Sequence, residues 1–301
     1  MNIVLPFDVI ATDLDGTFLS DTKQIPEINS RAVRLAGELG MPTVFATGRP
    51  LRWLRSLDDL ALPGNWVIAS NGAVTMHLAT GQITAVHTMD PATALAVAQQ
   101  IRAKLPNCGY AVEYAHRWGA EPGYPRRLDD AQADRLGTLP DLFTLEPVVK
   151  LLLLDPTNPT DRLAAAVEPI VAGRLTVTFS YVAQAGMLEL SAPGVSKALA
   201  LQDLLDRLGL TPQRLIAFGD MPNDLAMLRL AGQAYAMAGS HPSLLAAGYP
   251  IAGPNNEAAV GRTLLRLLGQ SDLLRLLGQS DQPGAGHPLI GRPPAGATID
   301  P

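Results

Sequence analysis

The chain has 301 residues, of which 47% are hydrophobic and 17% charged, with a net charge of −5 and an isoelectric point of about 5.5. This length suits one large domain or two of ordinary size, and the composition is that of a globular protein with a sizeable core. The acidic balance argues against a basic face for nucleic acid, and no window holds the ~20 nearly uninterrupted apolar residues of a membrane span.

The N-terminal residues lack a basic stretch ahead of a long apolar core, so they do not resemble a signal peptide. The single cysteine, Cys108, cannot form an intrachain disulfide, which makes a reducing compartment the default. We therefore expect a cytoplasmic protein, a monomer or homodimer, that binds neither nucleic acid nor membranes.

Apolar runs alternate with helical patterns in the first third of the chain. The runs at 8–13, 42–47 and 66–70 predict buried strands, and the segments 27–39 and 50–60 predict helices. Strands separated by helices imply parallel crossovers, so the sequence predicts an α/β fold with a Rossmann-like parallel sheet.

The rhythm changes from about residue 73. Neighbouring strand patterns without helices between them favour a mixed or antiparallel sheet. The stretch 115–146 is rich in Pro, Gly and Arg and predicts a loop with one short helix. The other predicted elements are two β runs around Ala79–Gln82, helices at 91–104 and 158–171, and strands at 109–114, 148–154, 174–180 and 186–191.

The alternation of strand and helix resumes near 195. It predicts helices at 195–208, at 222–231 and from about 255, with strands at 215–218 and 233–237. We therefore predict a discontinuous catalytic core and an inserted α/β cap domain. The predicted limits are 1–82 and 190–272 for the core and 83–189 for the cap.

An internal repeat lies near the C-terminus, where Leu264–Asp272 recurs without change at 273–281. Nine residues turn a helix through ~900°, so a continuous helix would place the second leucine set on the opposite face. We therefore expect Gly269 to end one helix and Ser271 to cap another. Residues 273–301 are predicted to hold the repeat copy and a disordered, Pro- and Gly-rich tail.

Four polar patches follow predicted strands or open a predicted helix. Such positions lie at the carboxyl edge of an open parallel sheet, where ligands bind. The first, Asp13-Leu14-Asp15-Gly16-Thr17, brings two carboxylates to one turn. One can attack phosphorus as a nucleophile, and the other can exchange protons with the leaving oxygen and with water. The same residues would also make an ordinary turn between a strand and a helix.

The second patch, Thr47-Gly48-Arg49-Pro50, joins a hydroxyl and backbone N–H groups before a predicted helix, a cradle for phosphate oxygens. The third is Lys197, a cation at a helix start, where the helix dipole favours negative charge. It gains a purpose if it faces an anion, although an ordinary surface lysine fits as well.

The fourth patch, Gly219-Asp220-Met221-Pro222-Asn223-Asp224, offers two carboxylates and an amide after an apolar run. Such oxygen ligands suit Mg²⁺. A turn followed by a capped helix is the ordinary alternative. Acidic patches on neighbouring strand ends would repel one another without a cation between them, so a metal is the better explanation.

In this order, the four patches resemble the phosphatases of the haloacid dehalogenase superfamily. The run Ser70-Asn71-Gly72-Ala73 and the large insert between the second and third patches resemble its Cof-type branch with a C2-type α/β cap. The resemblance covers about residues 7–262. It implies a Mg²⁺-dependent phosphatase of small phosphate monoesters, such as sugar phosphates or phosphorylated cofactors.

The resemblance also implies roles for single residues. Asp13 would be the nucleophile that forms a phosphoryl-aspartate, and Asp15 the general acid and base. Mg²⁺ would be held by Asp13, by the backbone carbonyl of Asp15 and by Asp220, with Asp224 supporting the metal shell. The residues implied to hold phosphoryl oxygens are Thr47, Gly48, Lys197 and Asn223, and those implied to touch the substrate are Arg49 and Asn71.

Some alternatives stay open at this stage. Dehalogenases of this superfamily lack a carboxylate at the position of Asp15, so its presence favours phosphate chemistry. A sugar-specific phosphatase of the sucrose-, trehalose- or mannosylglycerate-phosphate type, a phosphomutase, or a non-catalytic binding or regulatory protein could share this fold. The polar and aromatic stretch from Glu113 to Trp118, with Arg126 and Arg127, is either a recognition surface or a solvated loop.

Overall fold

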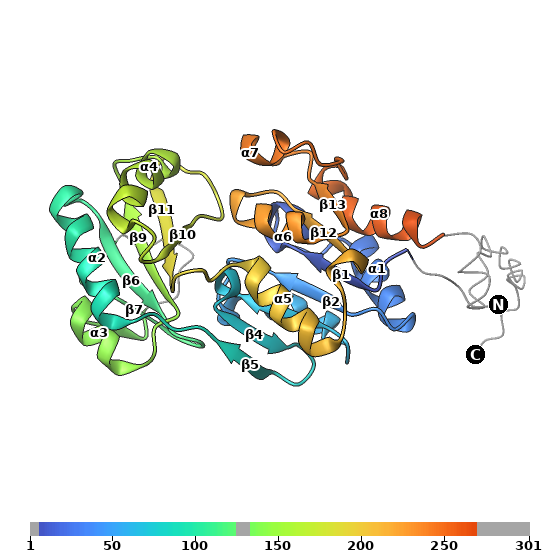
Figure 1. The fold of residues 1–301 in the computed structure, drawn as a ribbon, viewed down its shortest axis with the longest axis horizontal. Coiled ribbons are helices and arrows are strands. Elements are labelled where there is room, and N and C mark those ends of the chain that lie inside the picture. The colour runs from blue at the N-terminus through green and yellow to red at the C-terminus, as the bar shows by residue number, and fades with distance from the viewer. Residues whose placement is uncertain (1–5, 125–132, 270–301) are drawn as a thin grey trace, which may run out of the picture.

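The computed structural model of the protein describes residues 6–124 and 133–269, which form two β-sheets flanked by helices (Figure 1). This confirms the predicted α/β class. None of the helices within these two ranges has the length and apolar character needed to cross a membrane.

The first sheet has seven strands in the order β13-β12-β1-β2-β3-β4-β5. Its first five strands are mutually parallel, whereas β4 and β5 pair antiparallel at one edge. The strands are β1 (Val9–Thr12), β2 (Thr43–Ala46), β3 (Trp66–Ala69), β4 (Val74–His77), β5 (Gln82–Val86), β12 (Leu215–Gly219) and β13 (Gln233–Ala236).

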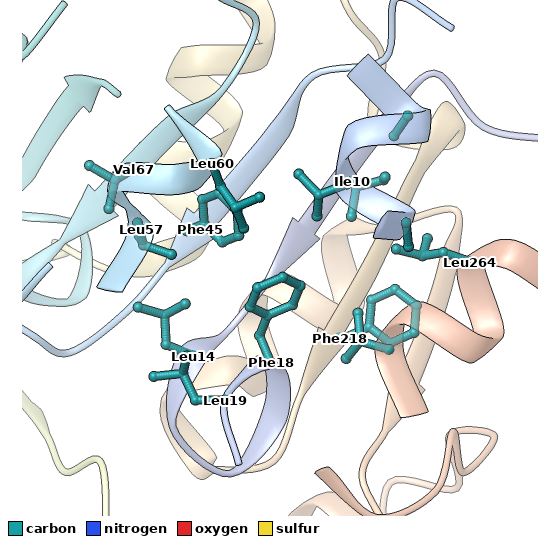
Figure 2. Packing of buried hydrophobic residues seen from close by; sticks show 14 of the residues in the cluster. Ile10, Leu14, Phe18, Leu19, Phe45, Leu57, Leu60, Val67, Phe218 and Leu264 are labelled. Atoms are coloured by element: carbon teal, nitrogen blue, oxygen red, sulfur yellow. The ribbon is translucent and has the colours of Figure 1, made fainter. Parts of the chain in front are cut away.

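Helices cover both faces of this sheet. Helices α1 (Glu27–Glu38) and α8 (Ala259–Leu267) pack on the face that carries Ile10. In the apolar cluster on this face, shown in Figure 2, the ring centroids of Phe18 and Phe45 lie 5.3 Å apart. Helices α5 (Lys197–Leu208) and α6 (Leu225–Leu230) pack on the other face. Because both faces are buried, the central strands are mostly apolar, which made them predictable.

The second sheet has six strands in the order β10-β11-β9-β6-β7-β8, and its neighbours are antiparallel except β7 and β8. One face is covered by α2 (Pro91–Lys104), α3 (Leu139–Leu145) and α4 (Thr160–Val171), while the other face carries Trp118, Tyr124 and Leu152. The strands are β6 (Gly109–Glu113), β7 (Trp118–Ala120), β8 (Arg135–Leu136), β9 (Lys150–Asp155), β10 (Thr176–Thr178) and β11 (Gly186–Ser191).

The sheets bear on the proposed domain limits. Strand β5 belongs to the seven-stranded sheet and β11 to the six-stranded one, so the limits at 83 and 190 each fall inside a strand. We therefore propose that the connections run through 87–90 and 192–196. The six-stranded sheet with its three helices would be the cap.

Several elements differ from the predictions. The predicted helix at 50–60 is two 3₁₀ segments, Leu51–Trp53 and Arg55–Leu60, separated at Leu54 by a non-helical φ of −101° and ψ of 8°. The stretch 115–146 contains β7 and β8 besides its predicted short helix, and α7 (Pro242–Leu245) was not predicted. Helix α8 ends before Gly269, which has the φ of +71° that favours glycine at a helix end, as predicted. The second repeat copy lies outside the described residues.

Candidate active site

Four loops meet at the carboxyl edge of the seven-stranded sheet. Asp13 follows β1, Thr47 follows β2, Asn71 lies in the turn after β3 and Asp220 follows β12. These strands are parallel neighbours, so their carboxyl ends lie at one edge. Helix α5 begins beside them at Lys197.

Lys197 joins two of the acidic residues. Its Nζ atom lies 2.5 Å from Oδ1 of Asp13 and 2.7 Å from Oδ1 of Asp224, and its side chain is 1% exposed. Ser196 caps α5 by accepting a hydrogen bond from the Leu199 N–H, which fixes where the helix starts. Burial lowers the pKa of Lys197, but the two carboxylates outweigh it and raise the pKa, so the side chain stays charged. The unfavourable position of this cation at a helix N-terminus is thus compensated by the anions that it faces.

The loop after β12 is held by its own carboxylates. Oδ2 of Asp224 accepts hydrogen bonds from the backbone N–H groups of Asp220 and Met221, each at 3.0 Å. Thr17 Oγ1 donates to Oδ1 of Asp220 at 2.8 Å, which ties this loop to the turn after β1. The Asp220 carboxylate therefore has a defined orientation next to Asp13.

The three carboxylates form a candidate metal centre. Ligand oxygens of Asp13, Asp220 and Asp224 lie within 4.8 Å of one another, and all three residues are buried. Burial raises the pKa of Asp13 well above its usual value; Lys197 opposes this, whereas Asp224 and Asp220 add to it. Burial and the charge of Asp224 likewise raise the pKa of Asp220 to about 7.

These residues fit a divalent cation. Three buried carboxylates face one ammonium group, and a hard cation with oxygen ligands would supply the missing positive charge. The Asp15 side chain is not among the three, and its predicted contribution through a backbone carbonyl stays a prediction.

Asp15 lies at the mouth of the site, with its side chain 30% exposed. Arg49 binds it through two nitrogens, Nε to Oδ2 at 2.6 Å and Nη2 to Oδ1 at 2.7 Å, and Lys23 Nζ lies 2.7 Å from Oδ1. Burial raises the pKa of Asp15, but the hydrogen bonds from Arg49 and Lys23 prevail and lower it to about 2. In this arrangement Asp15 is ionised, and Arg49 contacts the predicted acid and base.

Hydrogen bonds link the predicted phosphate cradle to Asn71 and, through it, to Asn223. The Arg49 N–H donates to Thr47 Oγ1 at 3.1 Å, and the Asn71 N–H donates to the Thr47 carbonyl at 2.9 Å. Asn223 Nδ2 donates to Asn71 Oδ1 at 2.9 Å, while Asn223 Oδ1 is buried without a hydrogen-bond partner among the described residues. The structure thus brings Thr47, Gly48, Asn71 and Asn223 together beside Asp13.

A pocket of about 540 Å³ opens from these residues between the two sheets. Its volume exceeds what a phosphate group fills, which leaves room for a leaving group. The residues that line it from the seven-stranded side include Asp13, Asp15, Thr47, Gly48, Arg49 and Asn223. Those that line it from the six-stranded side are Glu113, Trp118, Tyr124, Leu152, Ser180, Tyr181, Met187 and Glu189.

The predicted recognition stretch contributes Glu113 and Trp118 to this pocket, whereas Arg126 and Arg127 lie outside the described residues. Sequence reasoning missed Lys150 and Glu189, which are buried where the six-stranded sheet meets the cradle. Each is a charged residue flanked in the chain by apolar residues, a signal that could have identified it as a buried charge.

Residues 10–264 match the sequence profile of the haloacid dehalogenase-like hydrolases. The HMP-PP phosphatase of Cronobacter sakazakii (strain ATCC BAA-894) is 30% identical over 86% of the chain and 94% of its own length. The 5-amino-6-(5-phospho-D-ribitylamino)uracil phosphatase of Bacillus subtilis (strain 168) is 27% identical over 76% and 83%. A crystal structure from Streptococcus mutans UA159 superposes with a TM-score of 0.73 and 25% identity, covering 87% of this chain and 99% of that one.

Proposed function

The chain belongs to the haloacid dehalogenase-like hydrolase family as a Cof-type phosphatase, and we propose on that basis that it hydrolyses small phosphate monoesters through a phosphoryl-aspartate at Asp13 with Mg²⁺ as cofactor. The observation that carries this proposal is the buried group of Asp13, Asp220 and Asp224 around Lys197. Phosphoryl transfer depends on positioning and on neutralising spread negative charge. The three carboxylates would position a cation, and that cation together with Lys197 would supply the positive charge.

The proposed reaction has two steps. A carboxylate oxygen of Asp13 attacks phosphorus, the bond from phosphorus to the leaving oxygen breaks, and that oxygen takes a proton from Asp15. Water then attacks the phosphoryl-aspartate, gives a proton to Asp15 and releases inorganic phosphate, which restores Asp13. Lys197, Thr47, Gly48 and Asn223 hold the phosphoryl oxygens. When bound, Mg²⁺ would neutralise phosphoryl charge, held by Asp13 and Asp220 with support from Asp224.

Asp15 must carry a proton for the first step, although it is ionised when Arg49 and Lys23 bind it. The anionic oxygens of an incoming phosphate ester compete for these two cations. When Arg49 and Lys23 turn from Asp15 to the phosphate, the pKa of Asp15 rises and its carboxylate can hold a proton. Arg49 is therefore proposed to touch the substrate, as the family resemblance implies.

The leaving group is proposed to contact the aromatic and apolar side of the pocket. Trp118, Tyr124, Leu152 and Met187 lie there, and indole and phenol rings pack against both sugar rings and heterocycles. The Bacillus subtilis relative is named for a uracil-containing phosphate ester, so heterocyclic phosphates belong beside sugar phosphates among the substrates to test. We place the protein in the cytoplasm, where the buried thiol of Cys108 would stay reduced.

The test is phosphate release from a panel of sugar, polyol and heterocycle phosphates, with and without Mg²⁺. We expect metal-dependent release and no isomerised phosphate product, which separates hydrolysis from a mutase reaction. Asp13→Asn should lower kcat by about 10³-fold or more, the scale of losing a covalent nucleophile.

Asp8→Asn is the matched control, because Asp8 precedes β1 whereas Asp13 follows it. Asp8 forms a half-exposed ion pair with Arg214, so its loss should leave kcat unchanged. Turnover that survives Asp13→Asn would overturn the phosphoryl-aspartate mechanism.

A further inference from the structure

A buried ion pair lies where the six-stranded sheet meets the cradle. Lys150 at the start of β9 and Glu189 on β11 are 1% and 5% exposed, with Nζ 2.9 Å from Oε1. Glu113 pairs with Lys150 across strands β6 and β9, and its Oε2 lies 3.5 Å from the same Nζ. Arg52 belongs to the other lobe, which is built on the seven-stranded sheet, and its Nη2 lies 3.1 Å from Oε1 of Glu113. Burial lowers the pKa of Lys150, but Glu113 and Glu189 prevail and raise it, so the lysine is charged.

One member of this pair binds the predicted phosphate cradle, and the other binds Asn71, which was predicted to touch the substrate. Lys150 Nζ donates to the Gly48 carbonyl at 2.7 Å, and Asn71 Nδ2 donates to Oε2 of Glu189 at 2.5 Å. The contact is close-packed as well, because a Cβ atom on Gly48 would lie 2.3 Å from Ser180 Oγ. Residues of the proposed cap thus rest directly on the loop that follows β2.

Two hydrogen-bond routes lead from the pair to groups that face the substrate. The Gly48 carbonyl and the Arg49 N–H belong to one peptide unit, and that N–H donates to Thr47 Oγ1. Thr47 Oγ1 is thereby used as an acceptor, which leaves its proton free for a phosphoryl oxygen. On the other route, Asn71 Oδ1 accepts from Asn223 Nδ2, which fixes the orientation of that amide.

We propose that Lys150 and Glu189 are positioning residues for the phosphate site, Lys150 through the Gly48 carbonyl and Glu189 through Asn71 to Asn223, so that phosphate is bound tightly only when the cap rests on the core. This inference relies on the proposed phosphatase function. Attachment of the cap alone would not need a buried ion pair, since apolar residues of similar size are often equally stable in such places. Here, besides pairing with each other, the Lys150 ammonium also donates to the Gly48 carbonyl and the Glu189 carboxylate also accepts from Asn71.

The experiment measures binding of inorganic phosphate by calorimetry in the presence of Mg²⁺, together with KM, kcat and the melting temperature. The main variant is Lys150→Met combined with Glu189→Leu, which removes both charges and leaves Glu113 paired with Arg52. We expect a melting temperature close to that of the wild-type chain and phosphate affinity and kcat/KM lower by about 10- to 100-fold, as for a misplaced binding group.

Two further variants keep the test decisive. Glu189→Gln preserves the shape of the side chain and should fold even if the double variant does not, with weaker phosphate binding. Asp155→Asn is the control, because Asp155 is buried at the far end of β9 and its hydrogen-bond partners among the described residues, Cys108, Thr157 and Asn158, all belong to the proposed cap. It should lower the melting temperature and leave phosphate affinity unchanged.

A purely structural role predicts that phosphate affinity follows the melting temperature in all variants. A folded Glu189→Gln or double variant that binds phosphate like the wild-type chain would overturn the positioning role alone. Failure of the wild-type chain to bind phosphate with Mg²⁺ present would overturn the proposed function as well.

Discussion

Asp220 links the charge of the site to pH. In the metal-free protein its pKa is raised from 3.8 to about 7, chiefly by burial and by Asp224. Between these values the folded state binds a proton that the unfolded state has lost, so stability falls as pH rises from about 4 to about 7. A bound cation replaces that proton, and its binding must therefore strengthen over the same range.

We predict that the affinity for Mg²⁺ rises about tenfold or more for each pH unit below 7, because binding releases the proton of Asp220 and the raised pKa of Asp13 adds to this slope. The pH dependence of the affinity can be measured by calorimetric titration with Mg²⁺ at about pH 5.5 and about pH 7.5. The increase of the melting temperature with Mg²⁺ at the same two pH values gives a second measure. In Asp220→Asn the affinity should be weak and the slope should decrease. An equal gain in melting temperature at both pH values in the unmodified chain would contradict this.

The turn after β1 approaches the loop after β12 so closely that only glycine fits. Gly16 has a φ of +78°, and a Cβ atom there would lie 2.4 Å from Oδ2 of Asp220. Gly40, after α1, has nearly the same backbone with a φ of +76°, but no atom of the described residues lies within 4 Å of its Cβ position. Alanine at either position meets a similar backbone strain, on the order of 1 kcal/mol.

We therefore predict that Gly40→Ala lowers the melting temperature slightly and leaves Mg²⁺ binding unchanged. Gly16→Ala should lower it further and weaken Mg²⁺ binding by about 10- to 100-fold, the range seen when a ligand loses its orientation. Thermal unfolding with and without Mg²⁺ measures both effects. Equal results for the two variants would mean that backbone strain, and not the contact with Asp220, makes Gly16 necessary.

The elements also show what could be predicted from sequence. Helix α2 was predicted with its observed limits, because Asp90 caps it and Pro91 suits its first turn. The 50–60 segment was predicted wrongly, since its apolar spacing fits a helix but its backbone is 3₁₀ on either side of Leu54. The two-residue strand β8 pairs with β7, and the paired residues lie 16 positions apart in the chain (135 − 119), a contact that no local pattern contains.

The same distinction holds for the site. Core residues such as Asp13, Thr47 and Asp220 could be predicted to converge, since each follows a parallel strand and topology brings strand ends together. Lys150 and Glu189 could not, because their partners Gly48 and Asn71 belong to the other lobe. Packing between the lobes produces no periodic pattern in the sequence. A charge between apolar neighbours marks each of these positions as unusual, but it does not identify the partner.

The whole molecule combines two lobes at one pocket. The seven-stranded sheet contributes the acidic centre and the six-stranded sheet contributes the aromatic wall and Glu189. Among the described residues that line the pocket, the last in sequence is Asn223, and the family match ends at 264. Helix α8 lies beyond the pocket and completes the core, with Val260 and Leu264 fully buried.

We therefore predict that deleting 282–301 leaves kcat/KM within roughly twofold and barely changes the melting temperature, because the deletion removes neither the pocket nor the buried face of α8. The control is deletion from 259 onward, which removes α8 and should expose the face that it covers on α1, with loss of soluble protein. Activity assays and thermal unfolding of both chains measure the contrast. If the shorter deletion lowered kcat/KM more than about tenfold at an unchanged melting temperature, the C-terminal residues would have to act at the pocket itself, since a loss of fold would lower the melting temperature too.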